Sequence, residues 1–159
     1  MKKTLLVLTS LFVLFSFSTF AQHDHDHSHG HDHELKWHTN LEEAQKESAK
    51  TGHPIFVDFT GSDWCGWCIK LHKEVLSKKE FIEYAAHNLV LVEVDFPRRK
   101  KLPEAQEKYN ISLRDKYKVR GYPTILLLDK DGKVIETTGY MEGGPVNYVK
   151  HIKKLLAKK

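Results

Sequence analysis

Apolar positions along this chain change their period several times, and each change predicts a new element. Thr39–Glu42 has the pattern of a capping box and precedes a helical face over residues 41–50, with Gly52 as its stop. The runs 54–59 and 89–95 are apolar and rich in β-branched residues. Short runs of this kind are typical of strands that are buried on both faces.

Helical spacing of apolar residues returns further along the chain. It predicts helices from Cys65 to Leu76, from a capping box at Ser77–Glu80 to about Ala86, from Pro103 to about Tyr117, and from Pro145 onward. Two more strands, 124–128 and 133–138, flank the hairpin signal Asp129–Gly132. Strands and helices alternate first and a hairpin closes the sheet, so the fold class is α/β with a central mixed β-sheet flanked by helices.

The N-terminus has the pattern of a secretory signal peptide over residues 1–21. Lys2 and Lys3 precede an apolar core at 5–17, and Thr19–Ala21 provides a small-x-small cleavage site. The core is short for a span of about 30 Å of hydrocarbon, so a retained membrane anchor is the weaker alternative. We therefore expect an exported protein, periplasmic or extracellular.

Residues 22–36 form a polar segment in which every second residue from 23 to 33 is histidine. With no apolar residue to bury within that repeat, the segment is predicted to be a disordered His-rich N-terminal tail that precedes a folded domain at 37–159. Imidazoles on a flexible chain can bind zinc, copper or nickel. The metal ligands expected there are His23, His25, His27, His29, His31 and His33.

The overall charge excludes one class of partner. The formal net charge is +4, and the predicted signal peptide removes Lys2 and Lys3, which leaves +2. The basic run 98–101 and the basic C-terminus are not interleaved with aromatic residues, as nucleic-acid binding would favour. We interpret both as solvated surface and expect no nucleic-acid partner.

The two cysteines of the chain, Cys65 and Cys68, stand in the run Trp64-Cys65-Gly66-Trp67-Cys68. A disulfide across so short a loop would constrain the unfolded chain by only about 2 kcal/mol, which makes it a poor structural staple. No second cysteine pair completes a four-ligand zinc site. The spacing indicates a dithiol/disulfide redox pair, with metal ligation assisted by histidine, or an incidental pair, as the alternatives.

The predicted position of the pair at the start of a helix assigns the two sulfurs different roles. Unpaired backbone N–H groups and the helix dipole favour a thiolate at Cys65, which would be the nucleophile, and Cys68 would resolve the mixed disulfide. No His or Lys lies between them, so we expect a moderately acidic, reducing pair. Trp64 and Trp67 would contact the substrate, or alternatively pack the helix start.

From about Pro54 to Lys159 the chain resembles the thioredoxin-fold family. The matching motifs are the strand 56–59 followed by Trp64–Cys68, then Arg120-Gly121-Tyr122-Pro123-Thr124, and then the hairpin 126–134 with Gly139. Exported thioredoxin-like proteins and the periplasmic C-terminal domain of transmembrane disulfide reductases are the most similar members. The segment 96–118 is longer than the corresponding thioredoxin connection and is expected to affect partner choice.

The resemblance also implies roles for individual residues. Pro123 would have a cis peptide bond, and the backbone of Tyr122 would pair with the substrate like a strand. Asp58 would be a buried proton acceptor for Cys68, with a pKa raised by burial; a capping role at the strand end is the alternative.

Together these observations predict an exported thiol:disulfide oxidoreductase that reduces or isomerises protein disulfides through Cys65 and Cys68, as a monomer and without a required cofactor. A membrane thiol:disulfide electron donor would have to reduce it again. Two alternatives remain at this point. One is a copper or zinc buffer or delivery protein that uses the His-rich tail, and the other is a thioredoxin-fold adaptor with unreactive cysteines.

Overall fold

A computed structural model describes residues 35–158 of the chain. The predicted signal peptide, residues 1–21, and the histidines between 23 and 33 lie outside the described residues. None of the helices within 35–158 is long and apolar enough to cross a membrane.

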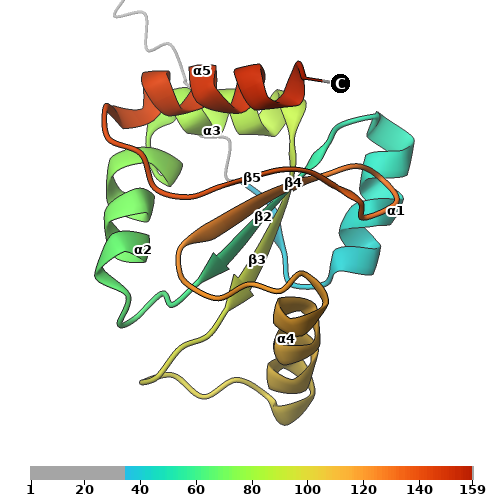
Figure 1. The fold of residues 1–159 in the computed structure, drawn as a ribbon, viewed down its shortest axis with the longest axis vertical. Helices are drawn as coiled ribbons and strands as arrows, with labels where there is room; N and C mark the ends of the chain where they lie inside the picture. Colours follow the sequence, from blue (N-terminus) through green and yellow to red (C-terminus); the bar gives the residue numbers. More distant parts are fainter. Residues whose placement is uncertain (1–34, 159) are drawn as a thin grey trace, which may run out of the picture. The chain divides into compact units, whose positions relative to one another are not determined.

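The described residues form a mixed five-stranded sheet with the order β1-β3-β2-β4-β5 (Figure 1). The strands are β1 (Trp37–His38), β2 (Ile55–Thr60), β3 (Val90–Asp95), β4 (Thr124–Leu128) and β5 (Val134–Thr138). β1 and β2 pair with β3 in parallel, whereas β4 is antiparallel to both β2 and β5. The predicted fold class, α/β with a mixed sheet, is confirmed, and β2 is buried along its whole length as expected.

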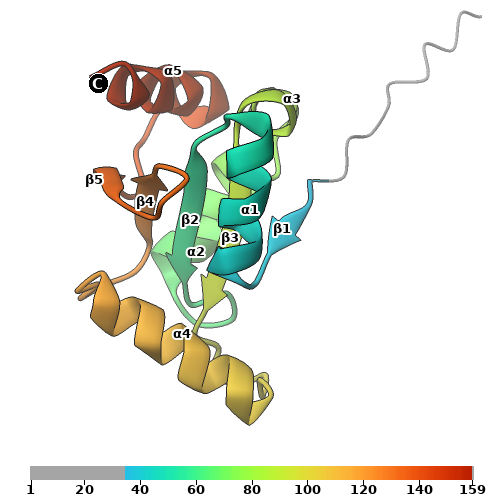
Figure 2. The same ribbon diagram turned by 90° about the vertical axis from the view of Figure 1, so that its right-hand side faces the viewer.

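The helices cover both faces of this sheet (Figures 1 and 2). They are α1 (Leu41–Thr51), α2 (Gly66–Leu71), the π-helical segment η1 (His72–Leu76), α3 (Lys79–Asn88), α4 (Glu104–Lys116) and α5 (Gly144–Leu156). Each predicted helix is therefore present, and the one predicted from Cys65 to Leu76 continues from α2 into a wider π turn. As predicted, Gly52 ends α1, in the left-handed conformation that glycine adopts readily.

Both predicted capping boxes are wrong in detail. Asn40, not Thr39, caps α1, because Asn40 is the extended residue and its side chain accepts a hydrogen bond from the Glu43 N–H at 2.9 Å. Ser77 does not cap α3, because it ends η1 and its hydroxyl donates back to the Lys73 carbonyl. β1 lies within the predicted folded domain, 37–159, but was not predicted as a strand; it pairs with β3.

The alternation of side chains along β2 divides the core into two clusters. Phe56 belongs to a cluster with residues of α2, η1, α3 and α5, whereas Val57 and Phe59 pack with residues of α1 and α4. Asp58 has the same parity as Phe56 and therefore points to the face that α2 and η1 cover. This register places a carboxyl group beneath the helix that starts at the cysteines.

Candidate active site at the Cys65–Cys68 disulfide

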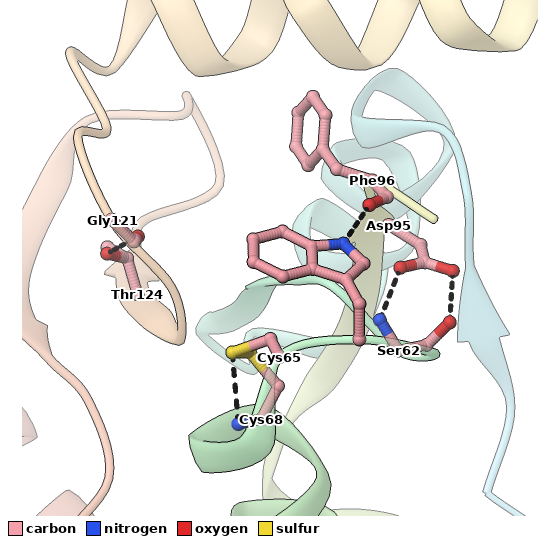
Figure 3. The surroundings of a disulfide bond; sticks show 8 residues. Ser62, Cys65, Cys68, Asp95, Phe96, Gly121 and Thr124 are labelled. Atoms are coloured by element: carbon pink, nitrogen blue, oxygen red, sulfur yellow. Dashed lines mark hydrogen bonds between the residues drawn. A yellow bond between two sulfur atoms is a disulfide. The ribbon is translucent and has the colours of Figure 1, made fainter. Parts of the chain in front are cut away.

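Cys65 and Cys68 form a disulfide where the chain leaves β2 and enters α2 (Figure 3). Their Cα atoms are 5.2 Å apart, an ordinary distance for a bridged pair. Cys65 is the N-cap residue of α2, and its Sγ accepts a hydrogen bond from the Cys68 N–H at 3.3 Å. The prediction that the helix begins at the cysteines is confirmed.

This geometry favours negative charge on the sulfur of Cys65. The N-cap position exposes it to the unpaired N–H groups of the first helical turn and to the positive end of the helix dipole. Cys65 is 7% exposed and Cys68 4% exposed. Both cysteines are buried in the disulfide form, so the N-cap position is what distinguishes Cys65: its thiolate would be stabilised there, while Cys68 follows one turn further into the helix.

A tightly packed turn holds the cysteines at the end of the sheet. The indole of Trp64 lies so close to Gly61 that a Cβ at Gly61 would be 2.6 Å from the ring. Its Nε1 donates to the carbonyl oxygen of Phe96 at 2.7 Å (Figure 3). Ser62 donates through both its N–H and its hydroxyl to the carboxylate of Asp95, at 2.9 and 2.6 Å. Only glycine leaves room at position 61 for this packing.

The two tryptophans of the motif differ in their surroundings. Trp64 is half-buried and packs against Gly61 and the chain after β3. Trp67 is 56% exposed, and its ring lies near that of Tyr140 and near the ammonium group of Lys70, at centroid distances of 5.3 and 5.1 Å. Among the described residues, Trp67 is thus a large apolar side chain left uncovered beside the disulfide, which makes it the better candidate for substrate contact.

The loop that carries Tyr122 and Pro123 faces the cysteines from the other side. The peptide bond between them is cis, as predicted. Gly121 and Thr124, which flank the pair and are joined by a hydrogen bond of 2.7 Å, lie across from the disulfide in Figure 3. The ring of Tyr122 is perpendicular to that of Trp64, with centroids 6.0 Å apart. The loop and the Trp64 turn therefore border the disulfide together.

Asp58 is buried inside β2, and its Oδ1 has no hydrogen-bond partner among the described residues. Burial, the largest cause, acts together with the nearby charges of Glu93 and Asp95 to raise the pKa of this carboxyl to about 8. The direction is the one that the family resemblance implied. The alternative of a strand-end cap is not supported, because β2 continues to Thr60 and the side chain of Asp58 caps nothing.

A cavity of about 250 Å³ connects Asp58 with the resolving cysteine. Asp58 and Cys68 both line it, together with His72 from η1 and Glu93 from β3. The pKa of Glu93 is raised by burial and by the charge of Asp95. Because water and protons can occupy such a space, the cavity provides a route between the carboxyl group and the thiol of Cys68.

Sequence reasoning did not assign Glu93 or the cavity to the site. One signal was present, since Glu93 interrupts an otherwise apolar strand, but which residue it faces depends on strand register. His72 is the histidine outside the tail that stands closest after the cysteines in the sequence, two helical turns beyond Cys65. It lies one turn after Cys68, and the N–H of His72 donates to the carbonyl of that cysteine.

The predicted metal ligands of the His-rich tail lie outside the described residues. Within 35–158, no group of three or more His, Cys, Asp or Glu side chains is arranged to hold a metal ion. The site described above is thus built from a disulfide, a buried carboxyl group and aromatic side chains.

Comparisons with known proteins agree with this site. A family model described as a thioredoxin-like domain matches residues 41–154. The chain is 40% identical to the disulfide bond reductase DsbH of Chlamydia pneumoniae over 122 residues, which cover 77% of this chain and 73% of that protein. It is 34% identical to the thioredoxin-related protein DsbJ of the same organism over 105 residues, 66% of this chain and 30% of the longer DsbJ.

Solved structures show the same relationship. A DsbH oxidoreductase superposes with a TM-score of 0.74 at 39% identity, covering 79% of this chain and 86% of that one. The C-terminal domain of Neisseria meningitidis DsbD in its reduced form superposes with a TM-score of 0.53 at 19% identity, covering 72% and 92%. At that identity the second match supports the fold alone.

Proposed function

The chain belongs to the thioredoxin-like family of thiol:disulfide oxidoreductases, and we propose that it reduces disulfide bonds in proteins outside the cytoplasm. One observation carries the proposal: the buried carboxyl of Asp58 lines the same cavity as Cys68, the resolving half of the Cys65–Cys68 disulfide. In an adaptor with unreactive cysteines, a buried carboxyl without a hydrogen-bond partner would cost stability and serve no reaction. The name of the related DsbH, a disulfide bond reductase, supports the reducing direction.

The reaction begins with the reduced dithiol. The Cys65 thiolate attacks one sulfur of the client disulfide, so that a Cys65–client bond forms and the other client sulfur leaves as a thiolate. The Cys68 N–H, which reaches Cys65 Sγ at 3.3 Å, stabilises the attacking thiolate before this step. The client is now half reduced and covalently bound.

The second step releases the client. The Cys68 thiol gives its proton to ionised Asp58 through the shared cavity, and its thiolate attacks Cys65 Sγ. The second client sulfur leaves as a thiolate, and the protein keeps the Cys65–Cys68 disulfide. Two electrons have passed from the protein to the client, so a dithiol donor must restore the reduced form. We assign that role to a membrane thiol:disulfide electron donor. Isomerisation would share only the first step: another client thiolate would attack the client sulfur of the mixed disulfide, form a new client disulfide and release Cys65 as a thiolate, with no net transfer of electrons.

The location proposed for this reaction is the periplasm or the extracellular space. The signal-peptide pattern at residues 1–21 supports export, and protein disulfides persist in oxidising compartments. The His-rich tail, with its alternating imidazoles, supports a separate proposal, capture of zinc, copper or nickel beside the redox domain. The redox reaction proposed here requires no cofactor, whether or not the tail binds metal.

The test is reduction of insulin by the mature protein, 22–159, with a thiol donor in excess. The Cys65→Ser variant is expected to lose the activity and a variant lacking 23–33 to retain it. Metal binding to both proteins is measured by calorimetry, with tight binding expected only where the tail is present. An inactive wild type that binds metal stoichiometrically would contradict the reductase proposal and favour the metal-buffer alternative.

A further inference from the structure

A groove of about 590 Å³ lies beside the active site, between the end of β3 and α4. It is lined by the basic side chains of Arg98, Lys100, Lys101 and Arg114 and by the apolar side chains of Phe96, Leu102 and Ile111, which together we call the basic groove. These residues belong to the long segment 96–118, and the reaction proposed above gives that segment no role.

The basic groove is joined directly to the cysteine motif. The guanidinium carbon of Arg98 lies 3.7 Å from the ring centroid of Trp64, the residue before Cys65. The indole of Trp64 in turn donates to the carbonyl of Phe96, which lines the groove. A polypeptide that presents a disulfide to Cys65 therefore has the groove within reach of its neighbouring residues.

The loop that carries the basic side chains is held in place. The carboxylate of Asp63 accepts hydrogen bonds from the backbone N–H groups of Arg98, Arg99 and Lys100, at 2.9, 2.7 and 3.0 Å. Three charge-assisted bonds to one carboxylate fix the path of the loop relative to the motif. The cations are thus presented by an ordered backbone on one side of the disulfide.

The charges of the groove are unbalanced. The carboxylates of Asp95 and Glu107 also line it, so four cationic side chains stand against two carboxylates in the groove. Both oxygens of Asp95 accept hydrogen bonds from Ser62. Arg114 pairs with Asp115, whereas the ion pairs found within residues 35–158 include neither Lys100 nor Lys101. Both ammonium groups are exposed; Lys100 lies near enough to Glu93 for its charge to lower the pKa of that carboxyl, but neither lysine is in an ion pair of the described residues.

We propose that the basic groove binds an acidic segment of the client protein that flanks the disulfide being reduced, with apolar residues of that segment against Leu102 and Ile111. Ile111 is 37% exposed and lines the groove, so its side chain is accessible to an apolar residue of the bound segment. A nucleic acid fits less well, because Phe96 already stacks on Tyr122 at 5.2 Å and is not open to a base. This inference rests on the proposed reductase function and names its preferred substrate class.

The experiment compares three disulfide peptides that differ only in flanking residues, which are Glu and Leu, Gln and Leu, or Lys and Leu. At low ionic strength we expect kcat/KM to be highest for the Glu peptide, by roughly threefold to tenfold over the Gln peptide, as for a few exposed charge pairs. The ratio of kcat/KM for the Glu peptide to kcat/KM for the Gln peptide should fall towards one in the double variant Lys100→Gln/Lys101→Gln. It should also fall towards one for the wild type in high salt. The matched control is Lys150→Gln/Lys154→Gln on α5, which loses the same charge at the opposite end of the sheet (Figures 1 and 2) and should keep the ratio.

A second measurement separates this inference from the reductase proposal. Binding of rhodamine-labelled, cysteine-free versions of the same peptides is followed by fluorescence anisotropy, which needs no redox activity. One outcome would be that no peptide is reduced but the Glu peptide still binds in a way that depends on Lys100 and Lys101. That outcome would support the proposal for the basic groove and contradict the reductase proposal. Equal binding of all three peptides, an equal loss in both double variants, or tighter binding of a poly-dT oligonucleotide of the same charge overturns the groove proposal.

Discussion

Asp58 and Glu93 stand opposite each other on the neighbouring parallel strands β2 and β3, and both line the cavity that reaches Cys68. Ionisation of both carboxyl groups is unfavourable, because each charge would be desolvated and would repel the other. Burial is the main cause of the raised pKa of Asp58, about 8, and the charge of Glu93 adds to it. The pKa of Asp58 therefore lies close to the pH range in which thiols ionise, where its ionised form can accept the proton of Cys68.

Replacement of Asp58 with Asn should change how stability depends on pH. The folded state of the wild type holds the Asp58 proton up to about pH 8, whereas the unfolded chain loses it near 3.8. The free energy of unfolding should therefore fall with rising pH between these values, by about 1.4 kcal/mol per pH unit from this group, and level off above them. Asp58→Asn should match the wild type at low pH and exceed it at pH 9.

Urea unfolding of the oxidised protein across this pH range measures the effect. Asp131→Asn, which removes an exposed carboxylate, serves as the control and should follow the wild-type curve. Parallel curves for the wild type and Asp58→Asn would contradict a raised pKa for Asp58.

Replacement of Glu93 with Gln should move the pH dependence of client release. If ionised Asp58 accepts the Cys68 proton, the release rate rises with pH around the pKa of Asp58. Removing the charge of Glu93 lowers that pKa, so the midpoint should shift to lower pH, by up to about one unit. Stopped-flow decay of a preformed Cys65–client mixed disulfide measures the rate. Glu80→Gln at the start of α3 is the control, and a midpoint that stays in place or rises would count against the proton route.

The two cysteines should differ sharply when replaced one at a time. Cys68→Ser keeps the N-cap thiol of Cys65 but cannot resolve, so a covalent client complex should accumulate. Cys65→Ser should form no such complex, because Cys68 lies one turn inside the helix and lacks the N-cap position that stabilises a thiolate. Non-reducing electrophoresis after incubation with insulin distinguishes them. Complexes formed equally through either cysteine would show that the assigned order of attack is wrong.

Trp67 should contribute to the binding of polypeptide clients but not to the chemistry. Trp67→Ala removes an exposed indole beside the disulfide, so KM for an unfolded protein client should rise by about threefold to tenfold with little change in kcat. Oxidised glutathione, which is too small to need the indole, should be reduced at the wild-type rate. Val146→Ala, on exposed α5 surface, is the matched control. A fall in kcat for both substrates would instead indicate that Trp67 holds the cysteines in position.

Much of the fold was predictable because its elements have strong local signals. The apolar run of β2, the helical spacing of α4 and α5 and the Gly132 hairpin each depend on neighbours close in sequence. The errors were also local. Asn40 rather than Thr39 caps α1, and β1 is too short to show a period, since pairing with β3 is what makes it a strand.

The sequence by itself determined the redox pair and its place at a helix start, because both depend on residues three positions apart in one segment. Only the tertiary structure decided what surrounds the pair. Glu93 faces Asp58 because of the register between β2 and β3, and Arg98 reaches Trp64 because Asp63 binds a loop more than thirty residues away. Burial, register and such distant contacts set the pKa of Asp58 and the charge beside the disulfide, and no local pattern encodes them.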